Sequence, residues 1–221
     1  MTQRPPPASR YQDSSRSEVL EFIPPGARRL LDVGCWRGAF GAAVKRAHPD
    51  CRVTGIELDH ESASIAQSRL DRVWRGEYPA DVPLGERFDV VTFLDVLEHL
   101  VDPWAALSAA WELLEPGGVV IAVIPNVRHL AVTARLVLRG RWDYQDSGLL
   151  DRTHLRFFTK QTMLKLFREC SYEVRQIQAL NLSGGKTGLL LRPGGRLVEQ
   201  FRALQYVVVA YPTSRSTMAR P

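Results

Sequence analysis

The sequence predicts an α/β fold, in which a largely parallel β-sheet is covered by helices on both faces. From residue 28 onwards, short apolar runs alternate with amphipathic segments, as in successive strand and helix units. The run FDVVTFL, residues 88–94, is so continuously apolar that it predicts a central strand buried on both faces. The segment LLDVGCWRG, residues 30–38, places glycines between a first strand and a helix, where such doubly wound sheets bind ligands.

The first half of the chain predicts a disordered arm, a short helix and four strand segments. Residues 1–16 are polar and proline-rich and lack the apolar core of a signal peptide, which predicts the arm. A short helix containing EVLEFI begins at residue 17. Apolar runs then predict strands over 29–33, 52–57, 71–74 and 88–94, and amphipathic segments predict helices over 39–47 and 61–70.

The second half predicts three further strands around a long irregular segment. A helix over 104–114 is expected to stop at EPGG, where proline cannot continue it and glycine favours a C-cap. The predicted strands cover 119–124, 172–180 and 205–211, and the predicted helices cover 130–138, 159–170 and a short stretch after SGGKTGLLLRPGG. Thr159 is the expected N-cap of its helix. The polar and aromatic stretch 139–158 is too long for a routine connection, and loops of that length are usually functional.

Composition places the chain among globular proteins and favours no nucleic-acid partner. Hydrophobic residues make up 45% and charged residues 24%, which excludes wholesale disorder and fibrous repeats. The net charge is +5, but the basic residues, nearly all arginine, are scattered without a long basic run. Three cysteines without CxxC spacing predict neither disulfides nor zinc, and fit a reducing cytoplasm. No apolar run approaches the ~20 residues of a membrane span. One domain over residues 17–221 is expected.

The glycine loop favours a cofactor without phosphates. A dinucleotide would require G-x-G-x-x-G, but the register from Gly34 gives Trp36 and then Ala39, which argues against a nicotinamide-dependent dehydrogenase. The spacing from Gly34 to Gly38, preceded by Asp32, better suits a ligand with an adenosine and an ammonium group. Asp32 would hold the ammonium, directly or through water.

The acidic residue at the end of the second predicted strand supports a ribose-binding site. Glu57 follows Gly34 by 23 residues, the distance at which an acid accepts hydrogen bonds from ribose hydroxyls. The alternative for this position is a surface acid at the end of a strand.

Four segments, taken in order, resemble the successive motifs of class I S-adenosylmethionine-dependent methyltransferases: LLDVGCWRGAFG, VTGIELD, FDVVTFLDVLEHLVDP and LEPGGVVIAVIPN. The resemblance extends over about residues 28–211. It implies a Rossmann-like sheet of seven strands in the order 3-2-1-4-5-7-6, with strand 7 antiparallel. It also implies S-adenosyl-L-methionine as cofactor and S-adenosyl-L-homocysteine as product.

The resemblance assigns cofactor contacts by position. Backbone approach would occur along the loop at Gly34, Cys35 and Gly38, with Asp32 near the methionine amino group. Ribose would bind Glu57 and adenine would pack on Leu58, while Glu77 stands where the family usually has an aspartate near the adenine amino group. Methionine and its sulfonium would lie by Leu94 and Asp95. Trp36 departs from the usual glycine, and its side chain can be accommodated if it points out of the loop.

The segments PNVRH and GRWDYQDSGLLDRTHLRFFT resemble a bacterial subgroup that modifies sugars, polysaccharides or natural products. This resemblance implies a substrate-covering insertion at about 126–158 and a small-molecule or glycan acceptor that is methylated on a hydroxyl. The substrate contacts predicted within the insertion are Asn126, His129, Trp142, Tyr144 and Arg152. Phe157 and Phe158 could also stack on an acceptor ring, although core packing is an equal alternative for them.

Methyl transfer to a hydroxyl requires alignment of the acceptor and removal of its proton, which makes His154 and His99 the candidate bases. No metal is expected. An alternative is a divalent ion, because the set Asp95, Glu98, His99 and His154 resembles the ligands of some small-RNA and ubiquinone-pathway O-methyltransferases. Without a metal, LEH would cap a turn after the fourth strand.

Two other classes of function remain open at the sequence level. An RNA or protein methyltransferase would share the cofactor motifs, and strong salt dependence of binding would favour RNA. A non-catalytic partner of a biosynthetic enzyme would bind the cofactor without turnover. Calorimetric titration with S-adenosylmethionine separates a cofactor-binding chain from one that has lost the site. The oligomeric state does not follow from the sequence.

Overall fold

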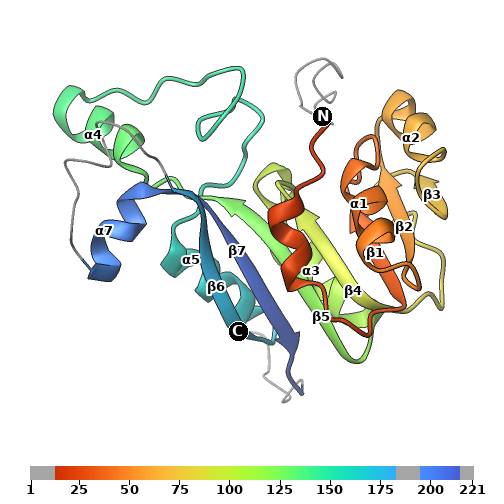
Figure 1. The fold of residues 1–221 in the computed structure, drawn as a ribbon. Helices are drawn as coiled ribbons and strands as arrows, with labels where there is room; N and C mark the ends of the chain where they lie inside the picture. Colours follow the sequence, from red (N-terminus) through yellow and green to blue (C-terminus); the bar gives the residue numbers. More distant parts are fainter. Residues whose placement is uncertain (1–12, 183–194, 215–221) are drawn as a thin grey trace.

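The computed structural model describes residues 13–182 and 195–214, which form a seven-stranded sheet with helices on both faces (Figure 1). The strand order is β3-β2-β1-β4-β5-β7-β6. Strand β1 pairs in parallel with β2 and β4, whereas β7 is antiparallel to both β5 and β6. The predicted order and the antiparallel seventh strand are therefore confirmed.

The strands are β1 Arg29–Val33, β2 Arg52–Glu57, β3 Arg72–Arg75, β4 Phe88–Leu94, β5 Leu114–Pro125, β6 Tyr172–Leu182 and β7 Ala203–Pro212. The α-helices are α1 Ala39–Ala47, α2 His60–Ala66, α3 Pro103–Leu113, α4 Leu130–Arg139, α5 Lys160–Glu169 and α7 Gly195–Arg202. Within residues 13–182 and 195–214, two 3-10 helices complete the elements, η2 Ser17–Phe22 and η3 Leu97–His99.

Two hydrophobic clusters hold the sheet between its helix layers. One cluster joins the sheet to α3 and α5 through residues such as Leu107 and Phe167. The other joins it to η2 and α1 through residues such as Phe22 and Val44. Strands β4 and β5 contribute to both clusters, because successive side chains of a strand point to opposite faces. The central strand predicted at residues 88–94 is thus buried on both faces.

Several helices and strands begin or end at residues other than those predicted. The chain enters β5 directly at Leu114, so EPGG lies inside this strand and not in a helix C-cap. A register shift between Phe88 and Val90 and the positive φ of Gly117 accommodate the irregular start of β5. Helix α2 ends at Ala66, before the predicted end, because the following residues form tighter bonds such as Arg69 N–H to the Ala66 carbonyl. The helix predicted from EVLEFI is a 3-10 helix.

The segment between β5 and α5 contains α4 and a loop held by few backbone contacts. Only Val132 of α4 is buried, and α4 lies at the periphery of the molecule (Figure 1). Isolated bridges join Asn126 to Phe158 and Gln145 to Asp151. Thr159 caps α5 as predicted, accepting a hydrogen bond from the Thr162 N–H in a capping box.

Some predictions fall on residues that the structure does not describe. The predicted arm at 1–16 lies outside the described residues as far as residue 12, and residues 13–16 are placed with defined contacts. The segment SGGKTGLLLRPGG lies almost entirely outside the described residues.

The three cysteines are free and buried. No described helix is long and apolar enough to cross a membrane.

Candidate functional site

The glycine loop after β1 has the geometry of a close-approach site. Gly34 has φ +67°, and a Cβ there would lie 2.8 Å from Val96 Cγ2. Gly38 has φ +77°, and a Cβ there would lie 3.2 Å from the Ala66 backbone. The N–H groups of Gly34 and Cys35 both donate to the Ile56 carbonyl, at 2.9 and 3.2 Å. Glycine is required at both positions, because each combines a left-handed backbone with a crowded surrounding.

Trp36 fits this loop through its backbone. Its φ is +52°, a conformation that glycine adopts readily and that costs other residues roughly 1–2 kcal/mol. The Trp36 N–H donates to Glu57 Oε2 at 2.8 Å, and the Arg37 guanidinium lies 5.8 Å from the indole centroid. The loop therefore keeps the backbone path of a glycine while carrying a half-buried tryptophan side chain.

Asp32 and Glu57 are two carboxyl groups held at the ends of adjacent strands. Asp32 is buried, and Oδ1 accepts a hydrogen bond of 2.8 Å from the Thr92 hydroxyl. Burial raises the pKa of Asp32 to about 7. Glu57 also accepts from the Asp59 N–H at 2.8 Å through Oε1, and burial raises its pKa. The structure thus brings both predicted cofactor acids to the edge that carries Gly34.

Asp95, at the end of β4, is bound by two residues that the sequence did not predict. Its Oδ2 accepts from the Arg16 guanidinium at 2.6 Å, and its Oδ1 accepts from the Gln205 side-chain amide. Loss of hydration raises the pKa of Asp95 to about 6, against the opposing effect of Arg16. Asp95 has φ +56°, so its backbone turns sharply where β4 ends. Arg16 and Gln205 belong to this end of the site.

The remaining predicted cofactor residues border the same edge. Leu58 follows β2 and is exposed, which leaves its side chain available to a ligand. Glu77 is exposed and follows Gly76, whose N–H donates to the Glu57 carbonyl at 3.0 Å. Leu94 is partly buried at the end of β4. Cys35 is buried against β2, since a Cβ on Gly55 would lie 2.4 Å from its Sγ.

The two candidate bases lie together. The rings of His99 and His154 are 4.7 Å apart and packed edge to face. His154 Nδ1 lies 3.3 Å from the Leu149 carbonyl, and His99 Nδ1 lies 3.2 Å from the Thr153 carbonyl. Burial lowers both pKa values, and that of His99 falls to about 4 with a contribution from His154.

Glu98 completes a group with these histidines. The potential ligand atoms of Glu98, His99 and His154 all lie within 4.8 Å of one another. Glu98 is buried, its pKa is raised by burial, and within the described part of the chain neither carboxyl oxygen has a hydrogen-bond partner. Asp95 is not part of this group. The structure therefore assembles three of the four residues in the alternative metal set.

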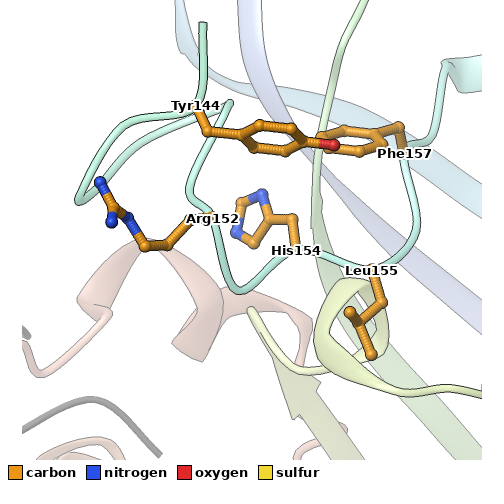
Figure 2. Close-up of a pocket in the computed structure, with 5 residues that line it drawn as sticks. All are labelled: Tyr144, Arg152, His154, Leu155 and Phe157. Carbon is orange, nitrogen blue, oxygen red and sulfur yellow. The ribbon is translucent and has the colours of Figure 1, made fainter. Parts of the chain in front are cut away.

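A cavity of about 410 Å³ opens beside His154 (Figure 2). It is lined by Tyr144, Arg152, His154, Leu155 and Phe157. In Figure 2 the Tyr144 and Phe157 rings lie along the top, His154 lies below them, and Arg152 and Leu155 lie to the left and lower right of His154. The backbone of Glu98 anchors the loop, because its carbonyl accepts from the N–H groups of Leu155 and Arg156 at 2.8 and 3.0 Å.

The other predicted substrate residues have different surroundings. The Asn126 amide is buried and donates to the carbonyls of Gln200 and Ala203 at 2.7 and 2.8 Å. His129 caps α4, with Nδ1 accepting from the Ala131 N–H at 3.3 Å. Trp142 packs against Phe157 at 5.1 Å between ring centroids, and Phe158 is in the core. Tyr144 and Arg152 are the predicted substrate residues that line the cavity.

The strand order, the glycine loop and the acids at the ends of β1 and β2 together define a class I S-adenosylmethionine-dependent methyltransferase fold. A protein family described as a methyltransferase domain matches residues 8–177. The chain belongs to this methyltransferase-domain family.

Curated relatives and solved structures agree with this assignment. An enzyme from Cereibacter sphaeroides named ubiquinone biosynthesis O-methyltransferase is 34% identical over 153 residues, covering 66% of this chain and 60% of the relative. The enzyme of the same name from Psychrobacter arcticus is 36% identical over 135 residues, covering 53% and 52%. The chain thus matches little more than half the length of these relatives. A SAM-dependent methyltransferase structure from Thermotoga maritima shares the fold with a TM-score of 0.63 at 18% identity, over 93% of this chain and 91% of that one.

Proposed function

We propose that this protein transfers a methyl group from S-adenosylmethionine to a hydroxyl group of a small aromatic acceptor. The observation that carries the proposal is the position of His154, which lines a cavity whose other walls include the rings of Tyr144 and Phe157. Aromatic walls favour a flat acceptor ring, and the histidine supplies a proton acceptor. The O-methyltransferase names of the curated relatives support the same reaction type.

The cofactor would bind along the edge formed by the ends of β1, β2 and β4. Glu57 would accept hydrogen bonds from the ribose hydroxyls, and Asp32 would face the methionine ammonium group. Arg16 is the cation beside Asp95 and would offset the methionine carboxylate. When bound, the cofactor supplies an electrophilic methyl group on its sulfonium. Gly34 and Gly38 allow the backbone to approach it closely, because neither position tolerates a side chain.

His154 would act as the general base. A backbone carbonyl can only accept, so the contact between His154 Nδ1 and the Leu149 carbonyl assigns the proton to Nδ1. Nε2 then carries the lone pair that receives the proton of the acceptor hydroxyl. Burial lowers the pKa of His154 below its ordinary value, which keeps the ring neutral at pH 7. His99 packs edge to face against this ring and restricts its orientation.

Replacing His154 tests this role. His154→Ala should reduce turnover by about 10²–10⁴-fold, the usual contribution of a general base, and leave S-adenosylmethionine affinity unchanged. In the wild type, the lowered pKa predicts that activity persists at pH 6.5 and falls at more acidic pH as the ring protonates. Initial rates across pH and calorimetric titration of the cofactor measure both effects. Wild-type turnover in the variant would remove His154 from catalysis.

The acceptor class can be determined with a small panel. Mass spectrometry measures the formation of S-adenosylhomocysteine with each acceptor. We expect this product with a catechol and not with a hexopyranoside or an RNA oligonucleotide. A methylated hexopyranoside would reassign the acceptor to the sugar class, and a methylated oligonucleotide would reassign it to RNA. Cofactor binding without turnover on any acceptor would support a non-catalytic partner.

A divalent ion is a second candidate for activating the hydroxyl. Glu98, His99 and His154 fit such an ion, because their ligand atoms converge within 4.8 Å and, within the described residues, the buried Glu98 oxygens have no other partner. A bound divalent ion would lower the pKa of a coordinated hydroxyl. Chelation with EDTA followed by added Mg²⁺ or Mn²⁺ separates the two candidates. Catalysis by His154 alone predicts unchanged activity after chelation, and an ion predicts loss and recovery.

A further inference from the structure

We propose that residues 13–16, the clasp, close over the cofactor site, and that release of the Asp13–Arg69 ion pair controls how fast the cofactor enters and leaves. The two ends of the clasp are bound on opposite sides of the predicted cofactor loop. The side chains at the outer end, Asp13 and Arg69, have no proposed role in methyl transfer. The inference concerns cofactor exchange, and it is independent of which acceptor is methylated.

The outer end of the clasp is fastened next to the glycine loop. Arg69, just after α2, donates from the same nitrogen to Asp13 Oδ2 at 2.7 Å and to the Arg37 carbonyl at 3.0 Å. Arg37 directly precedes Gly38 in the loop. One guanidinium therefore holds both the clasp and the loop that the cofactor must approach.

The inner end is fastened at the end of β4. Arg16 binds Asp95 Oδ2 at 2.6 Å and also donates to the Gln205 side chain at 3.4 Å. In the sheet, β1 lies between β2, which leads into α2, and β4. A segment that runs from Arg69 to Asp95 therefore passes across the end of β1, where Gly34 begins the loop. Figure 1 shows this part of the chain above the ends of these strands.

The two fastenings differ in the exposure of the arginine and in how many side chains hold the clasp, which determines the order of opening. The Asp13 and Arg69 side chains are 31% and 34% exposed, so water and salt weaken their attraction. At the inner end the Arg16 side chain is 16% exposed and the Asp95 side chain is 36% exposed, but Arg16 has three partners, Asp95, Gln205 and Glu18. The outer end should therefore open first.

The clasp can open without unfolding the helix that follows it. Arg16 has φ +46°, so the chain turns sharply at the start of η2. Val19 and Phe22 of η2 are buried in the cluster with α1 and β1 and keep that helix in place. The clasp can therefore move while η2 stays in place.

The test is the rate of S-adenosylhomocysteine exchange in the full chain, measured by stopped-flow tryptophan fluorescence without acceptor. Asp13→Asn should raise the association and dissociation rates by about 1.5- to 5-fold, the effect expected of an exposed ion pair, with little change in Kd. Raising NaCl from low to high concentration should accelerate dissociation from the wild type and have a smaller effect on Asp13→Asn.

Two controls separate gating from a structural role. Arg28→Gln removes another exposed ion pair, with Asp50, and should leave both rates at wild-type values. The Tm of unliganded Asp13→Asn should fall by no more than the small amount expected of an exposed ion pair, because the clasp is not part of either hydrophobic cluster. Exchange rates in Asp13→Asn equal to those of the wild type and of Arg28→Gln would overturn the proposal. A changed Kd with unchanged dissociation rate would also overturn it.

Discussion

Trp36 illustrates how far single residues can be predicted from this sequence. The spacing around it predicted that Gly34 and Gly38 make the close approach, and both have left-handed backbones in crowded surroundings. The sequence did not predict that Trp36 itself is left-handed and donates its N–H to Glu57. That contact connects the glycine loop to the end of β2, and the relative position of the two depends on the sheet. The backbone N–H of Trp36 thus helps to hold the Glu57 carboxylate in place.

Arg16 and Gln205 show the limit of the same approach. Arg16 lies in a polar stretch that predicted disorder, and its partner Asp95 is 79 positions away. Gln205 lies within a run predicted only as a strand. The spacing of residues predicts which side chains lie together on one helix, strand or loop. It does not predict contacts between elements that are far apart in the sequence, such as that of Arg16 with Asp95.

Glu57→Ala should weaken S-adenosylmethionine binding by about 1–3 kcal/mol, because it removes the acceptor predicted to bind the ribose hydroxyls. The variant also releases the N–H groups of Trp36 and Asp59. Calorimetric titration measures the affinity, and a parallel Tm measurement reports any loosening of the loop. Unchanged affinity would exclude the ribose role.

Arg16→Gln should discriminate between ligands with and without the methionine end. S-adenosylmethionine affinity should fall about tenfold or more, as expected for a lost charge-assisted hydrogen bond, and 5′-methylthioadenosine affinity should stay constant. The reason is that Arg16 stands beside Asp95, where the carboxylate-bearing end is predicted to lie. Arg28→Gln serves as a charge-matched control on the surface. Equal losses for both ligands would contradict this assignment.

The elements themselves follow the sequence closely where periodicity is strong. Strands β1, β2 and β4 and helix α1 have the predicted bounds. Strand β5 begins earlier than predicted, because its pairing with Phe88 across a register shift draws Leu114 and EPGG into the sheet. Proline and glycine gave a local signal for a turn, and sheet pairing overrode it. Whether the segment at 126–158 covers the substrate remains a prediction, supported by the cavity beside His154.

The N-terminus of α5 provides a stability test at this scale. Thr159→Ala should lower the free energy of unfolding by about 0.5–2 kcal/mol, because it removes one half of the capping box with Thr162. Urea denaturation measures the loss. Gln161→Ala, an exposed change in the same helix, should leave stability nearly unchanged. A Thr159→Ala midpoint equal to that of Gln161→Ala would show that the box contributes nothing.

The sheet has the strand order that the resemblance implied. The candidate site lies at the edge formed by the ends of β1, β2 and β4. Strand order alone places the ends of β1, β2 and β4 side by side. Sequence motifs could therefore predict Asp32, Glu57 and Asp95 as one site. The pairing of His99 with His154 could not be derived from order alone, because it depends on the path of the long loop and on its anchoring at Glu98.

Stability should respond to pH through the buried carboxyl groups. Because the folded-state pKa of Asp32 is about 7, the native state keeps a proton that the unfolded chain releases above its ordinary pKa near 3.8. The free energy of unfolding from this group therefore falls as pH rises from about 4 to 7. The lowered pKa of His99 acts in the opposite sense between about 4 and 6.5.

Asp32→Asn isolates the carboxyl contribution. Relative to the wild type, the variant should gain stability between pH 4 and pH 7, on the order of 2–4 kcal/mol, because it no longer ionises in a buried position. Urea titrations at a series of pH values measure the difference. A stability difference between the two proteins that stays constant across this range would contradict the raised pKa.

Because all three cysteines are buried, their reaction with a thiol reagent can report local opening of the structure. Cys35 lies in the glycine loop, Cys51 precedes β2, and Cys170 is the C-cap of α5, and each is buried. Burial also raises the pKa of Cys51 to about 11, so little reactive thiolate exists in the native state. A thiol-labelling reagent should therefore react only when a region opens. Identifying the labelled peptide would show whether the glycine loop, the segment between α1 and β2, or the end of α5 opens first.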